Sequence, residues 1–358
     1  MSVLAIVVTL LFAVQILSIA AAGWRLTRRA GRPADLPSIC LLVPVRGLDP
    51  TAAETLPAFL GQDHPHHRVL FCVEDAEDPV VAPIRALLDR HPGRGELLIG
   101  RDPISHNPKL NNMVKGWQAD DSGWVAMVDS NALIPRDYLS QLVAAHDGST
   151  GLVTSPAVGM RPKGVWGRVE AAFLNTHQAR WQFAADLFGA GFAQGKTLFW
   201  NRALLDSAGG LPALGRELAE DVASTKLVRE RGLRVRLVAQ PVFQPMGRRD
   251  LPSVWDRQLR WARIRRLGFP LLFLPELLLG GLLPLAGLAA LQPSLLPLGI
   301  AAWYGAEWVL ARVNGWPASW RDVAAMMLRD ALFPALWLWS WKSRTIAWRG
   351  RVLAPTVG

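Results

Sequence analysis

Four short clusters of residues carry most of the chemistry that this chain can do. Three are acidic, namely Val73-Glu74-Asp75, Asp129-Ser130-Asn131 and Glu220-Asp221, and the fourth is the basic and aromatic run Arg257-Gln258-Leu259-Arg260-Trp261. Carboxylate oxygens bind Mg²⁺ and Mn²⁺, and guanidinium groups suit bidentate binding of phosphate. We therefore expect a site for a phosphorylated ligand, assembled from segments that are far apart in the chain.

The cluster at Asp129 follows the apolar run Trp124–Val128, which predicts a strand. Asp129 and Asn131 place two oxygen-bearing side chains at positions i and i+2. Such a turn can hold a divalent cation, Mg or Mn, through Asp129 while a diphosphate fills the remaining positions. The alternative is an ordinary Asx turn that caps the next segment.

The other two acidic clusters have different expected roles. Asp75 follows a predicted strand and would contact the nucleotide ribose or base, or support the metal; the alternative is a solvated acidic turn before Pro79. Asp221 lies in a predicted helix over residues 216–231 and would act as the general base for an acceptor hydroxyl. The alternative for Glu220-Asp221 is the common preference for acidic residues near a helix start.

The basic cluster places Arg257, Arg260 and Trp261 on one helical face by i, i+3, i+4 spacing. This face could stabilise a departing diphosphate. It could equally lie on anionic lipid as an amphipathic basic helix, and the two roles are compatible. Lys109 could reach a phosphate or uracil, or be a surface lysine at a helix start. His177 is interpreted as a substrate-side residue, against the structural role that a lone histidine more often has.

Residues 36–266 alternate between strand and helix patterns, as expected for a sheet covered by helices. Strands are predicted at 38–45, 68–73, 96–99, 124–128 and 152–155, and helices at 55–62, 83–90, 110–118 and 135–145. Asp75 and Asp129 both come at carboxyl ends of strands, where α/β sheets gather ligands. We expect Asp75, Asp129 and Asp221 to converge around one cation.

Apolar segments flank this region. Residues 3–23 carry no charge and are long enough to span a bilayer, and Arg25, Arg28, Arg29 and Arg32 follow them. The positive-inside rule then puts the next domain in the cytosol, whereas the alternative is a cleaved signal peptide. Three more apolar stretches cover 268–291, 294–313 and 324–341. If all three spanned, the basic tail would lie outside, so we expect one to re-enter or lie in the interface.

The predicted domains are therefore a transmembrane anchor (1–24), a cytosolic domain (36–266), a C-terminal membrane region (268–341) and a basic tail (342–358). The chain has 358 residues, 51% of them hydrophobic, 16 tryptophans and a formal net charge of +10. A basic chain with apolar segments and no nucleic-acid-binding motif suits an anionic lipid surface rather than nucleic acid.

Together these residues resemble inverting family 2-type glycosyltransferases of the processive-and-lipid branch, and more closely ceramide glucosyltransferases and their bacterial relatives. The resemblance covers about residues 36–261 and the flanking membrane segments. It rests on Val43 to Pro50, Phe71 to Asp75 with Asp78-Pro79, Asn107 to Asn112, Asp129-Ser130, Leu218 to Asp221, and Arg257 to Trp261. Many relatives have a second acidic residue where Asn131 stands.

The resemblance implies a GT-A fold, the fold of nucleotide-diphospho-sugar transferases, with a UDP-sugar donor and a divalent cation. It implies Asp75 at the nucleotide, Asp129 at the metal-diphosphate, Asp221 as catalytic base, and Arg257, Arg260 and Trp261 completing the donor site. His177 stands where the family has a histidine near the acceptor. The expected activity is inverting hexosyl transfer from a UDP-sugar to the hydroxyl of a membrane lipid, most simply ceramide.

Alternative acceptors are a hopanoid, a polyprenyl phosphate or a diacylglycerol. A processive polysaccharide synthase is disfavoured, because its membrane region is usually longer. A non-catalytic membrane scaffold of the same fold has no chemical reason to keep all three aspartates. The richness in Ala, Arg and Leu suggests a high-GC bacterium, and hence an inner-membrane location with the catalytic domain in the cytosol.

Overall fold

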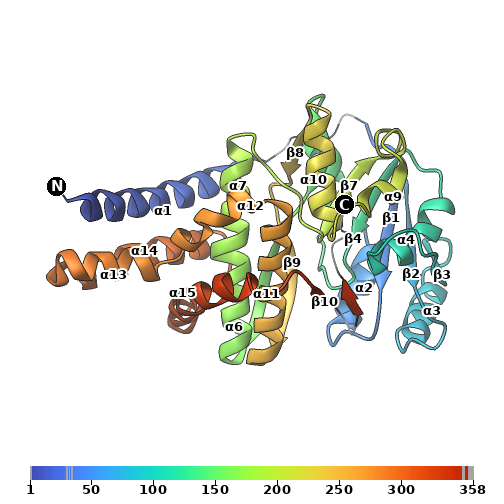
Figure 1. Ribbon diagram of the computed structural model, residues 1–358. Helices are drawn as coiled ribbons and strands as arrows, with labels where there is room; N and C mark the ends of the chain where they lie inside the picture. Colours follow the sequence, from blue (N-terminus) through green and yellow to red (C-terminus); the bar gives the residue numbers. More distant parts are fainter. Residues whose placement is uncertain (1, 30, 32, 34, 349–350, 354–358) are drawn as a thin grey trace. The chain divides into compact units, whose positions relative to one another are not determined.

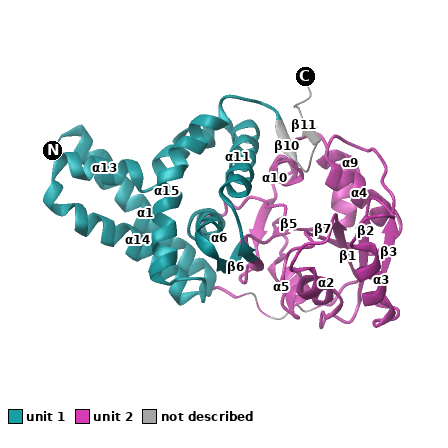
Figure 2. Ribbon diagram, turned by 90° about the horizontal axis from the view of Figure 1, so that it is seen from below, with its two compact units in different colours: residues 1–27, 158–187, 246–358 teal, residues 28–157, 188–245 magenta. Residues whose placement is uncertain are grey.

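The structure, a computed structural model, describes residues 2–29, 31, 33, 35–348 and 351–353. The chain folds into two compact units, each built from separate stretches of sequence (Figure 2). Unit 1 comprises residues 1–27, 158–187 and 246–358, and unit 2 comprises residues 28–157 and 188–245. The four predicted domains, each a continuous stretch of sequence, stay a prediction. Arg32, and residues 349–350 and 354–358 of the predicted tail, lie outside the described residues.

Unit 2 is built on one seven-stranded sheet with the order β3-β2-β1-β4-β7-β5-β8. The strands are β1 (Ile39–Val45), β2 (His67–Val73), β3 (Gly95–Ile99), β4 (Trp124–Val128), β5 (Thr150–Thr154), β7 (Thr197–Asn201) and β8 (Arg234–Leu237). The pairs β1–β2, β1–β4 and β2–β3 are parallel, whereas β7 runs antiparallel to both of its neighbours, β4 and β5. The carboxyl ends of β1, β2 and β4 therefore meet at one edge.

The helices of unit 2 alternate with these strands up to β5 (Figure 1). They are α2 (Ala52–Leu60), α3 (Val81–Asp89), α4 (Pro108–Gln118), α5 (Tyr138–Ala145), α8 (Arg202–Asp206), α9 (Gly210–Leu214) and α10 (Glu220–Glu230). The predicted α/β fold class is confirmed, and the predicted elements up to residue 154 agree within a few residues. Beyond β5 the pattern changes, because β6 (Ala157–Lys163) and β9 (Val242–Arg248) form a separate two-stranded sheet.

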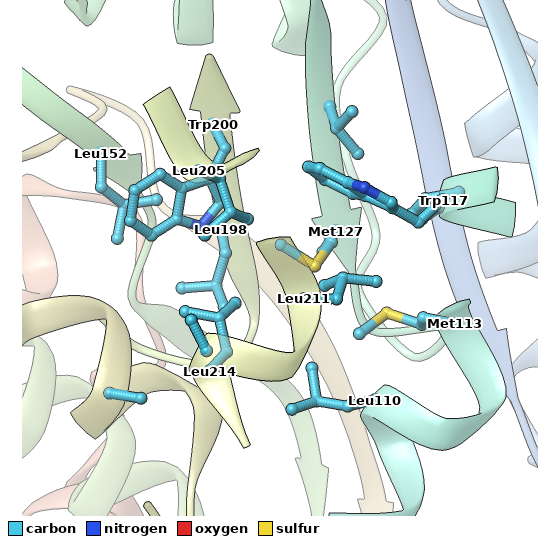
Figure 3. Close-up of a cluster of buried hydrophobic side chains, with 14 of the residues drawn as sticks. Leu110, Met113, Trp117, Met127, Leu152, Leu198, Trp200, Leu205, Leu211 and Leu214 are labelled. Carbon is cyan, nitrogen blue, oxygen red and sulfur yellow. The ribbon is translucent and has the colours of Figure 1, made fainter. Parts of the chain in front are cut away.

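Helix α4 connects the core of unit 2 to its polar edge. Leu110, Met113 and Trp117 recur at helical spacing and pack into a buried apolar cluster with Met127 of β4 and Trp200 of β7 (Figure 3). Gly116 lets the helix approach the sheet closely. A Cβ at this position would lie 2.8 Å from Leu42 Cδ2 and 2.9 Å from Cys72 Sγ. This packing fixes where the first turn of α4 begins.

Unit 1 is mainly helical, with short 3₁₀ and π segments between its helices. Its elements are α1 (Val3–Thr27), α6 (Gly164–Ala172), a π-helix (Phe173–Ala179), α7 (Arg180–Leu187), α11 (Leu251–Gly268), α12 (Pro270–Phe273), a 3₁₀ helix (Leu274–Leu279), α13 (Leu282–Leu291), a 3₁₀ helix (Pro293–Leu295), α14 (Leu296–Val313), α15 (Trp320–Ser340) and the strand pair β10 (Ile346–Trp348) and β11 (Arg351–Leu353). Helix α1 runs alongside α13 and α14 (Figure 1).

Two segments of unit 1 have the length and composition of membrane spans. In the part of the chain that the structure describes, α1 is the one helix long and apolar enough to cross a bilayer by itself. Residues Pro270–Leu279 and Leu282–Leu291 pass the same test only as a pair, bent by 49° at the break. The break falls at Gly280-Gly281, between two proline-containing helices. This geometry is that of a broken span or a re-entrant loop, as expected for one of the C-terminal stretches.

A buried ionic cluster holds the helices of unit 1 together. Arg329 of α15 donates two hydrogen bonds to Glu307 of α14, at 3.0 and 3.1 Å, and pairs with Asp330 at 2.8 Å. Gln15 of α1 donates to Glu307 at 3.0 Å, and the backbone N–H of Gly281 donates to Asp330 at 2.8 Å. The charges of Arg329 and Asp330 within an apolar helix are therefore mutually compensated.

Replacing Arg329 by Met should destabilise unit 1 strongly, because Asp330 would stay buried without its cation and Glu307 would keep the more distant Arg180, at 3.6 Å. Loss of one partner from a buried ion pair typically costs about 3–5 kcal/mol. We expect a clear fall in the melting temperature of the detergent-solubilised protein, and little change in a matched Arg321→Met variant, whose arginine is exposed on the same helix. Equal melting temperatures for the two variants would contradict this role.

Candidate active site

A buried lysine joins two carboxylates that lie far apart in the sequence of unit 2. Lys109 Nζ lies 2.7 Å from Asp129 Oδ1 and 2.7 Å from Glu220 Oε1, and it donates to the Gly195 carbonyl at 2.6 Å. Burial alone would lower the pKa of Lys109, but the carboxylates of Asp129 and Glu220 outweigh burial and raise that pKa above its usual range. The lysine is therefore permanently charged and holds β4, α4 and α10 to one point.

The segment Asn107–Asn112 positions this lysine. Asn107 caps α4 by accepting from the Lys109 N–H at 2.9 Å, and its amide donates to Glu220 at 2.8 Å. Pro108 occupies the first turn, where its fixed φ suits a helix start.

Two further asparagines of the segment bind neighbouring chain segments. Asn111 accepts from the Ser105 N–H at 2.9 Å, and Asn112 donates to the Cys72 carbonyl at the end of β2 at 2.7 Å. Each polar residue of the segment thus ties one neighbouring loop or strand to α4.

A second lysine, Lys196, lies on the other side of Asp129. Its Nζ is 3.2 Å from Asp129 Oδ2 and donates to Asn131 Oδ1 at 2.7 Å. Burial would raise the pKa of Asp129, but the ammonium groups of Lys109 and Lys196 hold it well below its usual range. The Asp129 side chain is nevertheless 31% exposed, whereas the side chains of Lys109 and Lys196 are 9% and 10% exposed.

Sequence reasoning missed Lys196, which precedes β7 and has no motif around it. Only the antiparallel pairing of β7 with β4 brings it opposite Asp129, where its carbonyl accepts from the Asp129 N–H at 3.1 Å. A lysine one residue before a predicted strand would have been the available signal. The antiparallel direction of β7, which brings Lys196 opposite Asp129, could not be predicted from the sequence.

Asp221 opens α10 beside this cluster. Its Oδ2 accepts from the Gly195 N–H at 3.1 Å, and its Oδ1 accepts from the Val222 N–H at 2.8 Å. Burial, followed by the negative charge of Glu220, raises the pKa of Asp221 to about 6. A partly exposed carboxylate with such a pKa suits proton transfer near neutral pH.

Asp75 lies outside this cluster, in the turn after β2. The residue is exposed and accepts from the Glu77 N–H at 3.0 Å, which makes a local turn. Strands β2 and β4 flank β1, so Asp75 is displaced from Asp129 by two strand spacings, about 10 Å. Asp78 instead joins the two strand ends by accepting from the Gly47 N–H at 2.8 Å. The sequence predicted that Asp75, Asp129 and Asp221 converge around one cation. The structure brings Asp129 and Asp221 to one cluster, whereas Asp75 lies further along the same sheet edge.

The remaining predicted site residues belong to unit 1. Arg257, Arg260 and Trp261 lie on α11, where Arg257 donates to Glu170 of α6 at 2.6 Å. His177 lies in the π-helix, 6% exposed, with its ring 4.8 Å from that of Phe333. Burial, followed by the charge of Arg329, lowers the pKa of His177 well below its usual range, so the ring is neutral. The roles of these residues stay predictions.

The side chains around Asp129 do not match the donor set of a protein-held divalent cation. Among the residues that the structure describes, no group of three or more His, Cys, Asp or Glu side chains could hold a metal ion. Both oxygens of Asp129 and the side-chain oxygen of Asn131 face ammonium groups. The Mg or Mn ion expected from the sequence stays a prediction, and no step below is derived through it.

Comparisons with known proteins agree with this architecture. A family model described as "Glycosyl transferase family 21" matches residues 6–357. The chain belongs to this family. Ceramide glucosyltransferase 1 of Caenorhabditis elegans is 25% identical over 275 residues, which are 76% of this chain and 59% of the relative. Ceramide glucosyltransferase of Komagataella phaffii is 24% identical over 294 residues, 65% of this chain and 58% of the relative.

This family 21 glycosyltransferase spans less than two thirds of the length of those relatives. Among solved structures, it resembles a mannosyltransferase from Pyrobaculum calidifontis in complex with GDP-Man and Mn2+, with a TM-score of 0.52 and 17% identity over 94% of this chain and 95% of the other. That likeness concerns the fold. The predicted resemblance to ceramide glucosyltransferases and the predicted GT-A fold are confirmed.

Gly195 should tolerate no side chain, because it lies against the charged cluster. An added Cβ would be 2.9 Å from Glu220 Oε1 and 3.6 Å from both Asp221 Oδ2 and Lys109 Nζ. Glu220 cannot retreat without losing its bonds to Lys109 and Asn107. We expect Gly195→Ala to reduce the transfer rate on the order of 10²-fold, the effect of a misplacement of about 1 Å at a catalytic centre.

The matched control is Gly148→Ala, since a Cβ there would meet open space. Initial rates and circular-dichroism melting curves of both variants separate a site defect from unfolding. Wild-type rates for Gly195→Ala would show that the cluster does not need this close approach.

Proposed function

We propose that this glycosyltransferase transfers a hexose from a UDP-sugar to the hydroxyl of a membrane lipid, ceramide, with inversion at the anomeric carbon. The ceramide glucosyltransferase relatives support the acceptor, and the GDP-Man bound to the mannosyltransferase of similar fold supports a nucleotide-sugar donor. The proposal is carried by one observation. A carboxylate with a raised pKa, Asp221, lies beside two ammonium groups that converge on Asp129.

These groups suit a single in-line displacement. The lipid hydroxyl oxygen attacks the anomeric carbon while the bond from that carbon to the diphosphate oxygen breaks. Asp221 accepts the hydroxyl proton, and the electron pair of the broken bond leaves with UDP. In this proposal Lys109 and Lys196 stabilise the charge that develops on the diphosphate, and an α-linked donor gives a β-glycoside. In this scheme Asp75 contacts the nucleoside. The donor-site roles of Arg257, Arg260 and Trp261 and the acceptor-side role of His177 stay predictions.

The membrane side of the proposal rests on α1 and the arginines that follow it. Arg25 is buried and pairs with Asp186 at 2.5 Å, so its charge is neutralised within unit 1. Arg28 and Arg29 are exposed beyond the end of the helix, and by the positive-inside rule they favour a cytosolic catalytic domain. The other basic residues of α11 would add attraction to an anionic lipid surface, as expected at a bacterial inner membrane.

The direct test uses membranes that contain the full chain, labelled UDP-glucose, UDP-galactose, UDP-GlcNAc or UDP-glucuronate, and added ceramide. We expect a labelled ceramide glycoside. Asp221→Asn should lower turnover roughly 10²–10⁴-fold, the usual contribution of a general base, with UDP binding largely unchanged. The matched variant Asp121→Asn, at an exposed position of unit 2, should keep wild-type turnover.

Wild-type turnover in Asp221→Asn would exclude the proposed base. Label in a hopanoid, a polyprenyl phosphate or a diacylglycerol instead of ceramide would replace the acceptor. If no donor releases UDP, with or without an added metal, a non-catalytic scaffold would be favoured.

The rate should depend on pH through Asp221. Because the base must be ionised, and its pKa is raised to about 6, kcat/KM should fall as the pH drops below about 6. Glu220→Gln removes one charge that raises this pKa, so the acidic limb should move to lower pH. Glu230→Gln, at the exposed end of the same helix, should leave it in place. An acidic limb that Glu220→Gln does not move would argue that another group titrates.

A further inference from the structure

We propose that Lys196 acts in the position of a divalent cation, so that this chain holds the diphosphate of its donor through Lys196 and Lys109 without a metal ion. The inference rests on the proposed function, because it takes the ligand to be a nucleoside diphosphate sugar. Lys196 is then a binding residue that the motif-based prediction of the site does not contain.

The geometry of the turn after β4 carries this inference. Asp129 and Asn131 are the two side chains whose i and i+2 spacing could hold a cation. Both present an oxygen to the Lys196 ammonium, at 3.2 and 2.7 Å. The other oxygen of Asp129 faces Lys109 at 2.7 Å. A divalent cation that used these oxygens would have to displace one ammonium group and lie close to the other, with repulsion between like charges.

The formal charges of this turn support the same inference. Asn131 is neutral, so Asp129 supplies the single formal negative charge of this turn. Mg²⁺ is usually held by one or two carboxylates together with substrate phosphates, so a metal here would depend on Asp129 for its carboxylate, whereas an amide oxygen accepts an N–H from an ammonium well. A neutral amide at Asn131 and an ammonium group at Lys196 thus suit each other better than either suits a divalent cation.

The backbone holds Lys196 in place. Its carbonyl accepts from the Asp129 N–H at 3.1 Å, and the next residue, Thr197, pairs with Val128 in the β4–β7 ladder. Lys196 is 8% exposed, unlike an ordinary surface lysine, while Asp129 beside it is accessible. A cation fixed in this way, at the rim of an accessible carboxylate, is preorganised for phosphate oxygens.

The test measures UDP binding to the purified full chain by calorimetry, after treatment with EDTA and again with added Mn²⁺. Wild type should bind UDP after EDTA treatment with an affinity that Mn²⁺ changes by less than about threefold. Lys196→Met should weaken metal-free binding about tenfold or more, the loss of one charge-assisted hydrogen bond. Added Mn²⁺ should restore the binding of this variant, because Asp129 and Asn131 become available to the metal.

Two further variants keep the test decisive. Lys196→Arg retains the charge and should retain metal-free binding. The second variant, Lys226→Met, removes a surface lysine of α10 that pairs with Glu217 at 2.5 Å. The second should behave as wild type. Wild-type binding that is lost in EDTA and returns with Mn²⁺ would overturn the inference while leaving the proposed function intact. Failure to bind UDP in either condition would instead overturn the proposed function, and this inference with it.

Discussion

The structure of unit 2 depends on one buried ammonium group, that of Lys109, held between Asp129 and Glu220. Removing three charges from water is costly, so the arrangement is stable only when each charge meets its counterpart with good geometry. That requirement explains the residues around it. Asn107 caps the helix and holds Glu220, Pro108 starts the helix, and Gly195 leaves room for the carboxylates.

The same cluster separates the properties of two aspartates. Asp129 lies against two lysines, which keep it ionised, whereas Asp221 lies beside Glu220, which favours its protonated form. Pairs of carboxyl groups whose environments move their pKa values apart are typical of sites that both bind charge and transfer protons. In the proposed function, Asp221 would accept the proton of the acceptor hydroxyl, and the lysines beside Asp129 would face the leaving diphosphate.

Unit 1 uses buried charge in a different way. Glu307 and Asp330 are compensated by Arg329 and Arg180 among apolar helices, and Gln15 extends the cluster to α1. Here the buried charges join helices that come from separate stretches of the sequence. The bend at Gly280-Gly281 belongs to the same cluster, because Asp330 accepts the Gly281 N–H.

Local pattern alone determined the alternation of strands and helices up to Thr154, the apolar helix α1, and the place of Asp129 at the end of its strand. It put Asp221 inside a helix over residues 216–231, whereas α10 begins at Glu220. Hydrophobic periodicity and helix-start signals act over a few residues, so they can be read along the chain. Tertiary structure alone decided that Lys196 faces Asp129, that Glu170 engages Arg257, and that Asp78 rather than Asp75 joins the ends of β1 and β2. Those contacts arise from strand order, strand direction and helix packing, which bring together residues that carry no mark of one another in the sequence.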